Sequence, residues 1–387
     1  MERVDYFLTE EQQMIVDVAR QITDEYIIPQ RAGLDEKEEF PIEILKAIAK
    51  ADLFGLYIPE QYGGFGGGCF DMVLALEQFG RGCVGIATSF AASALGVYPI
   101  LLSGSEEMKQ RYLPDVAAGR KRAAFALTEA NAGSDASGIQ TTAVLEGDFW
   151  VLNGTKQWIT NGGEAQIHSV IAITDRTKGP RGASFFVVED TDPGFSWGVK
   201  EKKLGIRASA TRELIFKDCR IPKDRLIGRV GTGFITVMKT LDLSRPGIAS
   251  LGVGLGQGAL DEAVTYAKQR VQFGKPIISF QAIQHMLADM AIQVEASRAL
   301  VYAAARHIDA HKESMSKASS MCKVMATDMA MKVTVDAVQV LAGYGYMRDY
   351  PVEKMMRDAK ILQIYEGTNQ IQRNVIGQEL NKEYNNK

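Results

Sequence analysis

The chain has 387 residues, of which 46% are hydrophobic and 24% are charged, and this length predicts two or three domains around a large core. The formal net charge of −3 argues against nucleic-acid binding, so we expect local Arg or Lys residues or helix N-termini to hold any phosphate-bearing ligand. The four cysteines lack the spacing of a metal site and are expected to be free, buried thiols in a reducing compartment.

Residues 1–120 have the pattern of an α-helical domain. Residues 9–12 (Thr-Glu-Glu-Gln) have the composition of a capping box, and the apolar residues after it keep helical spacing until Pro29. A second amphipathic helix is expected after residues 40–41 (Phe-Pro). The acidic start resembles neither a signal peptide nor a transit peptide, which predicts a cytoplasmic protein. A mature mitochondrial matrix protein that has lost its leader would have the same kind of N-terminal sequence.

Residues 84–102 contain no charged residue, and a stretch of this length can span a bilayer. Pro99, two glycines and several hydroxyl side chains interrupt it, and no basic flank marks it as a stop-transfer segment. We therefore expect a helix that is buried in a large core or lines an apolar pocket, without membrane insertion.

Residues 121–230 have a different pattern. Short apolar runs with a period of two alternate with turn residues such as Asn153-Gly154, and this predicts an antiparallel β domain. The runs lie at residues 141–145, 149–152, 168–174, 183–189 and 212–218.

Helical patterns return after residues 231–233 and continue to the C-terminus, so residues 231–387 are expected to form a third, α-helical domain. The segments at residues 280–307 and 324–341 have almost no polar face. They are typical of bundle helices that are buried on both sides, by neighbouring helices or by other subunits.

Two patterns in this part invite other interpretations. Residues 251–258 alternate glycine with other residues inside a helical stretch and lack the spacing of a dinucleotide fingerprint, so they indicate small residues at a close helix contact. His307 and His311 are four residues apart on a helix, but no third ligand is evident, and no metal site is expected.

Glu366 lies between the apolar pair Ile364-Tyr365 and the flexible Gly367. A carboxylate against apolar neighbours loses hydration, which raises its pKa. The glycine lets the backbone approach a ligand closely. This combination suits a general base that removes a weakly acidic proton from carbon. The alternative is a solvated Glu in a turn at a helix end.

The surroundings of Glu366 resemble the C-terminal signature of the acyl-CoA dehydrogenases. Residues 364–372 read Ile-Tyr-Glu-Gly-Thr-Asn-Gln-Ile-Gln, and residues 350–360 before them also resemble this signature. Segments at 124–135, 158–162, 270–276 and 339–345 resemble further motifs in the family's order. The resemblance covers nearly the whole chain and implies an α+β multidomain fold: an N-terminal α-helical domain, a middle antiparallel β-barrel-like domain and a C-terminal four-helix bundle.

The resemblance implies FAD-dependent α,β-dehydrogenation of an acyl-CoA thioester to the trans-2-enoyl-CoA. Glu366 would abstract the α proton while a hydride passes from the β carbon to flavin N5, and an electron-transfer flavoprotein would take the electrons. A family subgroup has its base in a Leu-Asp-Leu-Glu-Arg string, where this chain has Ser244, so Glu366 is the candidate. Two alternatives stay open: an enoyl-CoA reductase that works in reverse with a bifurcating electron-transfer flavoprotein, and a non-catalytic helical scaffold.

The resemblance also implies a homotetramer, because the family's FAD is shared across a subunit interface, with Gln339 and Gly343 acting from a neighbouring subunit. It assigns four residues to the CoA substrate: Ser134, Asp242, Arg245 and Gly367. It assigns these residues to FAD: Phe125, Leu127, Thr128, Ser134, Trp158, Ile159, Thr160, Arg270, Gln272, Phe273, Gln281, Gln339, Gly343, Thr368, Asn369 and Gln370. The length and shape of the acyl chain stay open.

Overall fold

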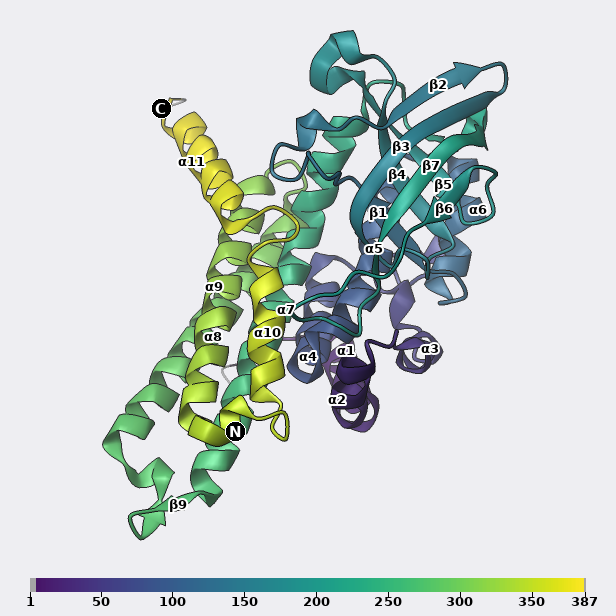
Figure 1. Cartoon of the computed structure of the whole chain (residues 1–387). Helices are drawn as coiled ribbons and strands as arrows, with labels where there is room; N and C mark the ends of the chain where they lie inside the picture. The colour runs from purple at the N-terminus through teal and green to yellow at the C-terminus, as the bar shows by residue number, and fades with distance from the viewer. Residues whose placement is uncertain (1–4, 386–387) are drawn as a thin grey trace.

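A computed structural model describes residues 5–385 of the chain. Helices form the first part, a sheet follows, and long helices form the last part, with the sheet lying to one side of the long helices (Figure 1). This order confirms the predicted succession of helices, sheet and helices.

The first helix, α1 (Glu10–Ile22), begins where the sequence predicts. The Gln12 N–H donates to Thr9 Oγ1 and the Thr9 N–H donates to Gln12 Oε1, both at 3.2 Å, which completes the capping box. The predicted end of this helical run at Pro29 is wrong. The backbone continues through a π-helical turn (Thr23–Ile27) into α2 (Ile28–Lys37). Pro29 lies in the first turn of α2, where a missing N–H costs no hydrogen bond.

The N-terminal part continues with α3 (Ile42–Lys50), α4 (Cys69–Gly82), α5 (Val84–Ser103) and α6 (Glu106–Ala117). By length and composition α5 could cross a membrane, since its mean hydropathy is 1.6, but 78% of that window is buried inside the protein. It packs against the sheet through β1 (Ala123–Ala126) and against the long helix α7 (Gly233–Gln269). It is therefore a core helix, as the sequence predicts.

Eight strands form the sheet, which includes β1, and along its main path the order is β6-β7-β3-β2-β4-β5-β8. The prediction of a purely antiparallel sheet is wrong at β1, which pairs parallel with β4, and at the single parallel pair of Thr142 with Ile173. The reason is that β1 enters from α6 and reaches β4 only after β2 and β3, so no hairpin joins the two strands. The remaining strands are β2 (Thr142–Glu146), β3 (Phe149–Thr160), β4 (Ile167–Ile173), β5 (Ala183–Glu189), β6 (Phe195–Trp197), β7 (Thr211–Pro222) and β8 (Leu226–Ile227).

The C-terminal part packs α7 against α8 (Gln281–Ala310), α9 (Ser316–Leu341) and α10 (Val352–Leu362), while α11 (Asn369–Asn385) packs against α9 (Figure 1). A two-stranded hairpin, β9 (Val271–Gln272) and β10 (Lys275–Pro276), joins α7 to α8 at the far end of the bundle. The glycines of residues 251–258 lie at a close helix contact, as predicted. A Cβ atom on Gly254 would lie only 2.0 Å from the Glu77 carbonyl oxygen on α4.

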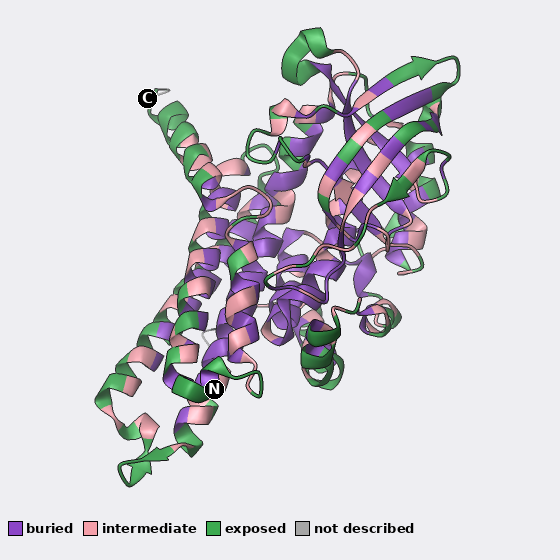
Figure 2. Ribbon diagram, in the orientation of Figure 1, coloured by how far each residue is buried: buried purple, intermediate pink, exposed green. Residues whose placement is uncertain are grey.

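Within this chain α8 and α9 are buried on one side only (Figure 2). Apolar side chains remain on their outer faces, among them Ile292, which is 65% exposed, and Met321, Met325 and Val335. The predicted burial on both sides is therefore not achieved by the helices of one chain. The four cysteines are free and buried, as expected.

Candidate active site

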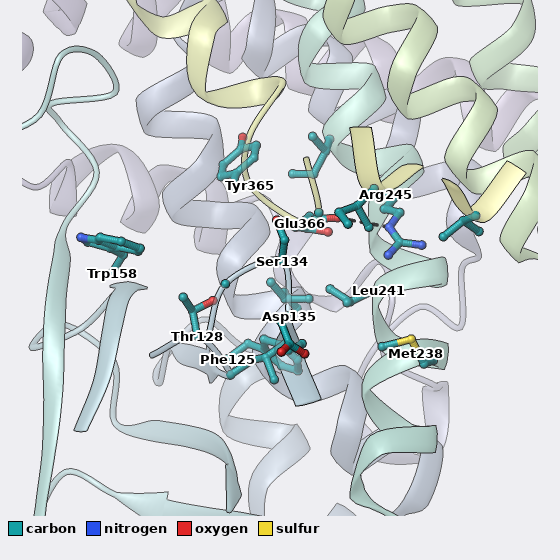
Figure 3. Close-up of a pocket in the computed structure, with 18 of the residues that line it drawn as sticks. Phe125, Thr128, Ser134, Asp135, Trp158, Met238, Leu241, Arg245, Tyr365 and Glu366 are labelled. Atoms are coloured by element: carbon teal, nitrogen blue, oxygen red, sulfur yellow. Dashed lines mark hydrogen bonds between the residues drawn. The ribbon is translucent and has the colours of Figure 1, made fainter. Parts of the chain in front are cut away.

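A cavity of about 650 Å³ lies between the sheet, α5, α7 and the loop that joins α10 to α11. Figure 3 shows Trp158 on one side and Arg245 on the other, with Ser134 and Glu366 between them. A second cavity of about 610 Å³ shares several of these residues and continues toward residues 201–206 and α10. The shared residues are Thr128, Gly133, Ser134, Trp158, Thr160, Tyr365, Glu366 and Gly367.

The sheet side of the cavity is formed by β1 and the loop after it. Phe125 lies on β1, Leu127 and Thr128 follow, and Ser134 lies in the loop. A buried ion pair anchors this loop: Lys156 Nζ on β3 donates to Glu129 Oε1 at 2.8 Å and to the Leu127 carbonyl at 3.0 Å. Burial lowers the pKa of Lys156 to about 8. The pair fixes the backbone on both sides of Thr128, and sequence reasoning missed it.

The end of β3 supplies Trp158, Ile159 and Thr160. The register of β3 against β7 shifts between Lys156 and Ile159, and Trp158 adopts a left-handed backbone with φ +56°. This bulge turns the indole outward to the rim, where it is 56% exposed, while Ile159 stays buried beneath the strand. The bulge therefore places an aromatic ring at the rim of both cavities.

Glu366 lies in the loop between α10 and α11, with φ +55°, and Gly367 follows with φ +90°. A left-handed backbone is strained for a residue with a side chain, so surrounding contacts must hold it. Arg245 Nε and Gln372 Nε2 both donate to the Glu366 carbonyl oxygen at 3.2 Å. The Ser244 hydroxyl donates to the Glu366 carboxylate.

One side of the Glu366 carboxylate faces the cavity and protein atoms surround the rest of it. This desolvation raises its pKa, in the direction expected from its apolar neighbours, while the Ser244 hydrogen bond and the charges of Arg245 and Lys323 oppose the rise. A carboxylate in this environment is suited to accept a proton from a bound ligand.

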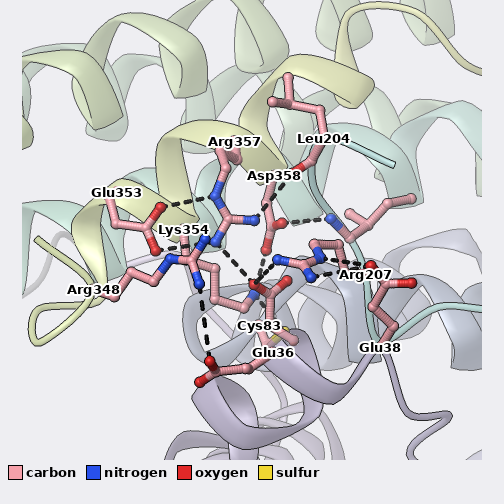
Figure 4. Close-up of polar contacts among 12 residues, drawn as sticks. Glu36, Glu38, Cys83, Leu204, Arg207, Arg348, Glu353, Lys354, Arg357 and Asp358 are labelled. Carbon is pink, nitrogen blue, oxygen red and sulfur yellow. Dashed lines mark hydrogen bonds and ion pairs between the residues drawn. The ribbon is translucent and has the colours of Figure 1, made fainter. Parts of the chain in front are cut away.

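Polar contacts also fix α10, the helix that precedes the loop with Glu366 (Figure 4). Lys354 Nζ donates to Cys83 Sγ at 3.1 Å and pairs with Asp358, whose Oδ1 accepts from the Ile206 N–H at 2.6 Å. Arg357 pairs with Asp35 of α2 and donates to the Leu204 carbonyl oxygen. These contacts tie α10 to the N-terminal helices and to residues 204–206, which form a wall of the second cavity.

The four predicted substrate residues are not all at the cavity. Ser134, Arg245 and Gly367 line it, and Asp242 does not. Asp242 Oδ1 instead accepts from Arg245 Nη1 at 2.7 Å and its other oxygen accepts from Ser316, so Asp242 orients the guanidinium.

The predicted flavin residues fall into three sets: residues that line a cavity, two residues at the start of α11, and a group at the far end of the bundle. Phe125, Leu127, Thr128, Ser134, Trp158, Ile159 and Thr160 line the first cavity, and Thr368 lines the second. Asn369 is buried among Lys323, Thr327 and Asp328, and Gln370 is exposed.

The remaining predicted flavin residues lie at the far end of the bundle, at the β9–β10 hairpin and the neighbouring ends of α8 and α9 (Figure 1). Phe273 in this hairpin is 93% exposed, and Arg270 stacks over the Tyr344 ring at 5.4 Å. One chain does not bring this group to the cavity; the group comprises Arg270, Gln272, Phe273, Gln281, Gln339 and Gly343.

Ser244 and Lys323 touch the Glu366 loop, and sequence reasoning assigned a role to neither. Lys323 directly precedes the apolar segment at residues 324–341, and nothing in the sequence distinguishes it from the other lysines of α9. For Ser244 the sequence shows its place beside Arg245 but gives no indication that its hydroxyl meets residue 366, which lies 122 positions later.

Comparison with known families identifies the chain. The models "Acyl-CoA dehydrogenase, N-terminal domain", "middle domain" and "C-terminal domain" match residues 9–120, 124–219 and 231–381 in that order. The chain therefore belongs to the acyl-CoA dehydrogenase family and is an oxidoreductase with a flavin cofactor. The cavity fits a flavin, because its apolar walls, aromatic rim and few hydroxyl groups suit a flat ring system with a polar edge.

Individual relatives agree with this identification. The chain is 47% identical over 373 residues to the probable acyl-CoA dehydrogenase FadE25 of Mycobacterium tuberculosis, covering 96% of both chains. It is 44% identical to the acryloyl-CoA reductase (NADH) of Anaerotignum propionicum, covering 99% of this chain and 97% of that protein. The structure of butyryl-CoA dehydrogenase from Megasphaera elsdenii superimposes with a TM-score of 0.95 at 42% identity, covering 97% of this chain and 100% of that one.

Proposed function

We propose that this protein catalyses FAD-dependent α,β-dehydrogenation of an acyl-CoA thioester to the trans-2-enoyl-CoA, with Glu366 as the base. The observation that carries this proposal is the environment of the Glu366 carboxylate. The carboxylate is desolvated, accepts a hydrogen bond from the Ser244 hydroxyl and is open to both cavities. Its position lets it meet a ligand that enters between the sheet and α7.

In this proposal Glu366 removes the α hydrogen of the substrate as a proton. The β hydrogen leaves as a hydride, so two C–H bonds break and one carbon–carbon π bond forms. When bound, FAD supplies the two-electron acceptor for the hydride. The thioester oxygen gains negative charge as the proton leaves, and the Glu366 backbone N–H is the proposed donor that stabilises it. Ser134, Arg245 and Gly367 hold the CoA portion, and Asp242 keeps Arg245 in place.

The proposed partners are an electron-transfer flavoprotein and further copies of the chain. A solved structure described as the electron transferring flavoprotein of Acidaminococcus fermentans contains a chain that is 45% identical to this one and superimposes with a TM-score of 0.95. The exposed apolar faces of α8 and α9 support a homotetramer in which the hairpin residues complete a neighbouring copy's FAD site. Relatives in Mycobacterium tuberculosis and Bacillus subtilis are bacterial proteins, which supports a cytoplasmic location.

A second candidate is the reverse reaction, reduction of an enoyl-CoA. The acryloyl-CoA reductase named above and a caffeyl-CoA reductase–Etf complex subunit of Acetobacterium woodii, 43% identical over 373 residues, favour it. Both directions use the same residues, because the base of one direction is the acid of the other.

The test is an anaerobic titration of the purified protein with a panel of saturated acyl-CoAs, followed by visible absorption. We expect the flavin band to bleach with at least one of them. The matched variant Glu366→Gln should keep its flavin and lose about 10²–10⁴-fold in the bleaching rate, the usual contribution of a general base. A variant with a near-wild-type rate would contradict the role of Glu366. If none of the acyl-CoAs bleaches the flavin, but an enoyl-CoA reoxidises the flavin after it has been reduced with dithionite, the result would favour the reductase.

A further inference from the structure

Lys323 is a buried lysine beneath the loop that carries Glu366. It lies on α9, and its side chain is fully buried. Its Nζ donates to the Gly367 carbonyl at 2.9 Å and to Asn369 Oδ1 at 2.8 Å. Gly367 directly follows Glu366, and Asn369 is the first residue of α11, so one ammonium group ties the loop to the start of the next helix.

No carboxylate of the described residues lies within ion-pair distance of Lys323. Burying an ammonium group without a direct counter-ion costs free energy. Burial accordingly lowers the pKa of Lys323 to about 7, and the charge of Glu366 opposes that fall, while Arg245 adds to it. The ionised form of Glu366 and the charged form of Lys323 therefore stabilise each other.

The hydrogen bonds of Lys323 complete a set that holds the strained turn. Arg245 and Gln372 bind the Glu366 carbonyl, and Gln372 and Lys323 bind the Gly367 carbonyl. Because Gly367 has great conformational freedom, the turn would otherwise adopt many conformations. Holding it keeps Glu366 in place at the cavity.

We propose that Lys323 is a positioning residue for the reaction, which fixes the Glu366 turn through its hydrogen bonds to Gly367 and Asn369. This inference rests on the proposed role of Glu366 as the base. Lys323 contacts neither cavity, so it acts through the turn and through its electric field.

The pH dependence of the turn involves groups on every element that packs against it. Arg245 on α7 and Lys323 on α9 favour the ionised carboxylate. Asp328 on α9 favours the charge on Lys323 and is itself paired with Arg373 of α11. Further titratable groups near the turn are Cys69 on α4, which lines a small cavity with Glu366, Asp242 on α7, Cys322 on α9, Tyr98 on α5 and Tyr365.

Three variants of the holoenzyme separate charge from hydrogen bonding. Lys323→Met removes both, Lys323→Gln keeps an amide donor without charge, and Thr327→Val removes a hydrogen bond to Asn369 while Lys323 stays charged. The first measurement is the rate of anaerobic flavin bleaching by an acyl-CoA between pH 5 and 9. The second is an infrared titration of the Glu366 carboxyl, identified by its absence in Glu366→Gln.

We expect the acid limb of the bleaching rate to move up by about one pH unit in both Lys323 variants, as for the loss of a nearby opposite charge, and to stay in place in Thr327→Val. Lys323→Met should also bleach about 10-fold more slowly than Lys323→Gln, with little change in the acyl-CoA concentration for half-maximal rate, because only Met lacks a donor to the turn. The infrared titration should show the same upward shift for the carboxyl.

An unchanged acid limb and an unchanged carboxyl titration in Lys323→Gln would overturn the inference. Failure of both Lys323 variants to fold, with Thr327→Val folded, would assign Lys323 to stability alone and would also overturn it. If the wild-type flavin bleaches with no acyl-CoA, the proposed dehydrogenation fails, and the infrared titration still tests separately whether Lys323 acts on the Glu366 carboxyl.

Discussion

At the scale of single residues, the site depends on opposing effects on one carboxylate. Desolvation raises the pKa of Glu366, and Ser244, Arg245 and Lys323 oppose it. Desolvation acting alone would favour the protonated carboxyl, which cannot accept a proton. If the cations dominated, it would be too weak a base for a proton on carbon. The contacts at this loop therefore set the proton affinity of the base as well as its position.

Another buried titratable residue affects stability instead of chemistry. His168 on β4 is fully buried, its Nδ1 lies 3.2 Å from the Val188 carbonyl oxygen, and its Nε2 has no hydrogen-bond partner among the residues that the structure describes. Burial lowers its pKa to about 4, whereas the unfolded chain has the ordinary value of about 6.5. Between these values the unfolded state binds more protons, so stability falls as the pH drops from 6.5 to 4.

We predict that His168 accounts for a loss of up to about 3 kcal/mol in the free energy of unfolding over this pH range. His168→Leu, which cannot be protonated, should reduce the pH dependence by that amount. Urea unfolding of both proteins at pH 7 and pH 4.5 measures the difference. An equal loss in both proteins would show that His168 is not the group that titrates.

The sequence identified Glu366 because its apolar neighbours and its motif lie next to it in the chain. Ser244 and Lys323 could not be found in this way, since they reach Glu366 only when α7 and α9 pack beside the loop. Side chains that are distant in sequence carry no local signal of their future neighbours. The sequence therefore predicts the site residues that lie in motifs, but it does not predict the residues that hold them in place.

At the scale of elements, the packing of α4 on α7 sets the position of the helix that carries Arg245. Alternating glycines let the two backbones approach closely, and a Cβ on Gly254 would lie 2.0 Å from the Glu77 oxygen and 2.8 Å from the Arg81 nitrogen. Backbone atoms of two packed helices cannot move aside cheaply.

We predict that Gly254→Ala destabilises the protein by about 3 kcal/mol, the upper part of the usual range for overpacking. Gly377→Ala is the matched control, because Gly377 also lies in a helix and a Cβ there meets nothing within 4 Å. It should stabilise the protein by about 0.5–1 kcal/mol through helix propensity. Thermal unfolding of both variants tests the pair, and equal effects would contradict the close-contact interpretation.

Periodicity predicted the type of most elements, because helices and strands differ in the spacing of their apolar residues. It failed at Pro29, where a π-helical turn keeps the chain helical, and at β1, whose parallel partner lies about 40 residues away. Both errors concern geometry that depends on distant parts of the chain.

At the scale of the whole molecule, one chain does not bring all the predicted flavin residues together. The residues at the cavity and the residues of the β9–β10 hairpin lie at separate ends of the bundle. If both groups bind the same FAD, they must come from different copies, and retention of the flavin must depend on assembly. The exposed outer faces of α8 and α9 provide the apolar area for that contact.

Phe273 offers a test of this dependence, because it is 93% exposed in a hairpin that packs on little else. We predict that Phe273→Ser lowers the assembly state and increases flavin loss together, since burying a phenylalanine contributes about 1.5–3 kcal/mol to an interface. Val144→Ser is the control, because Val144 is 56% exposed on β2, away from the bundle (Figure 1). This substitution should change neither the assembly state nor the flavin content. Sedimentation velocity with detection at the protein and flavin bands measures both quantities in one experiment. A smaller species that keeps its full flavin content would show that one chain suffices to bind the cofactor.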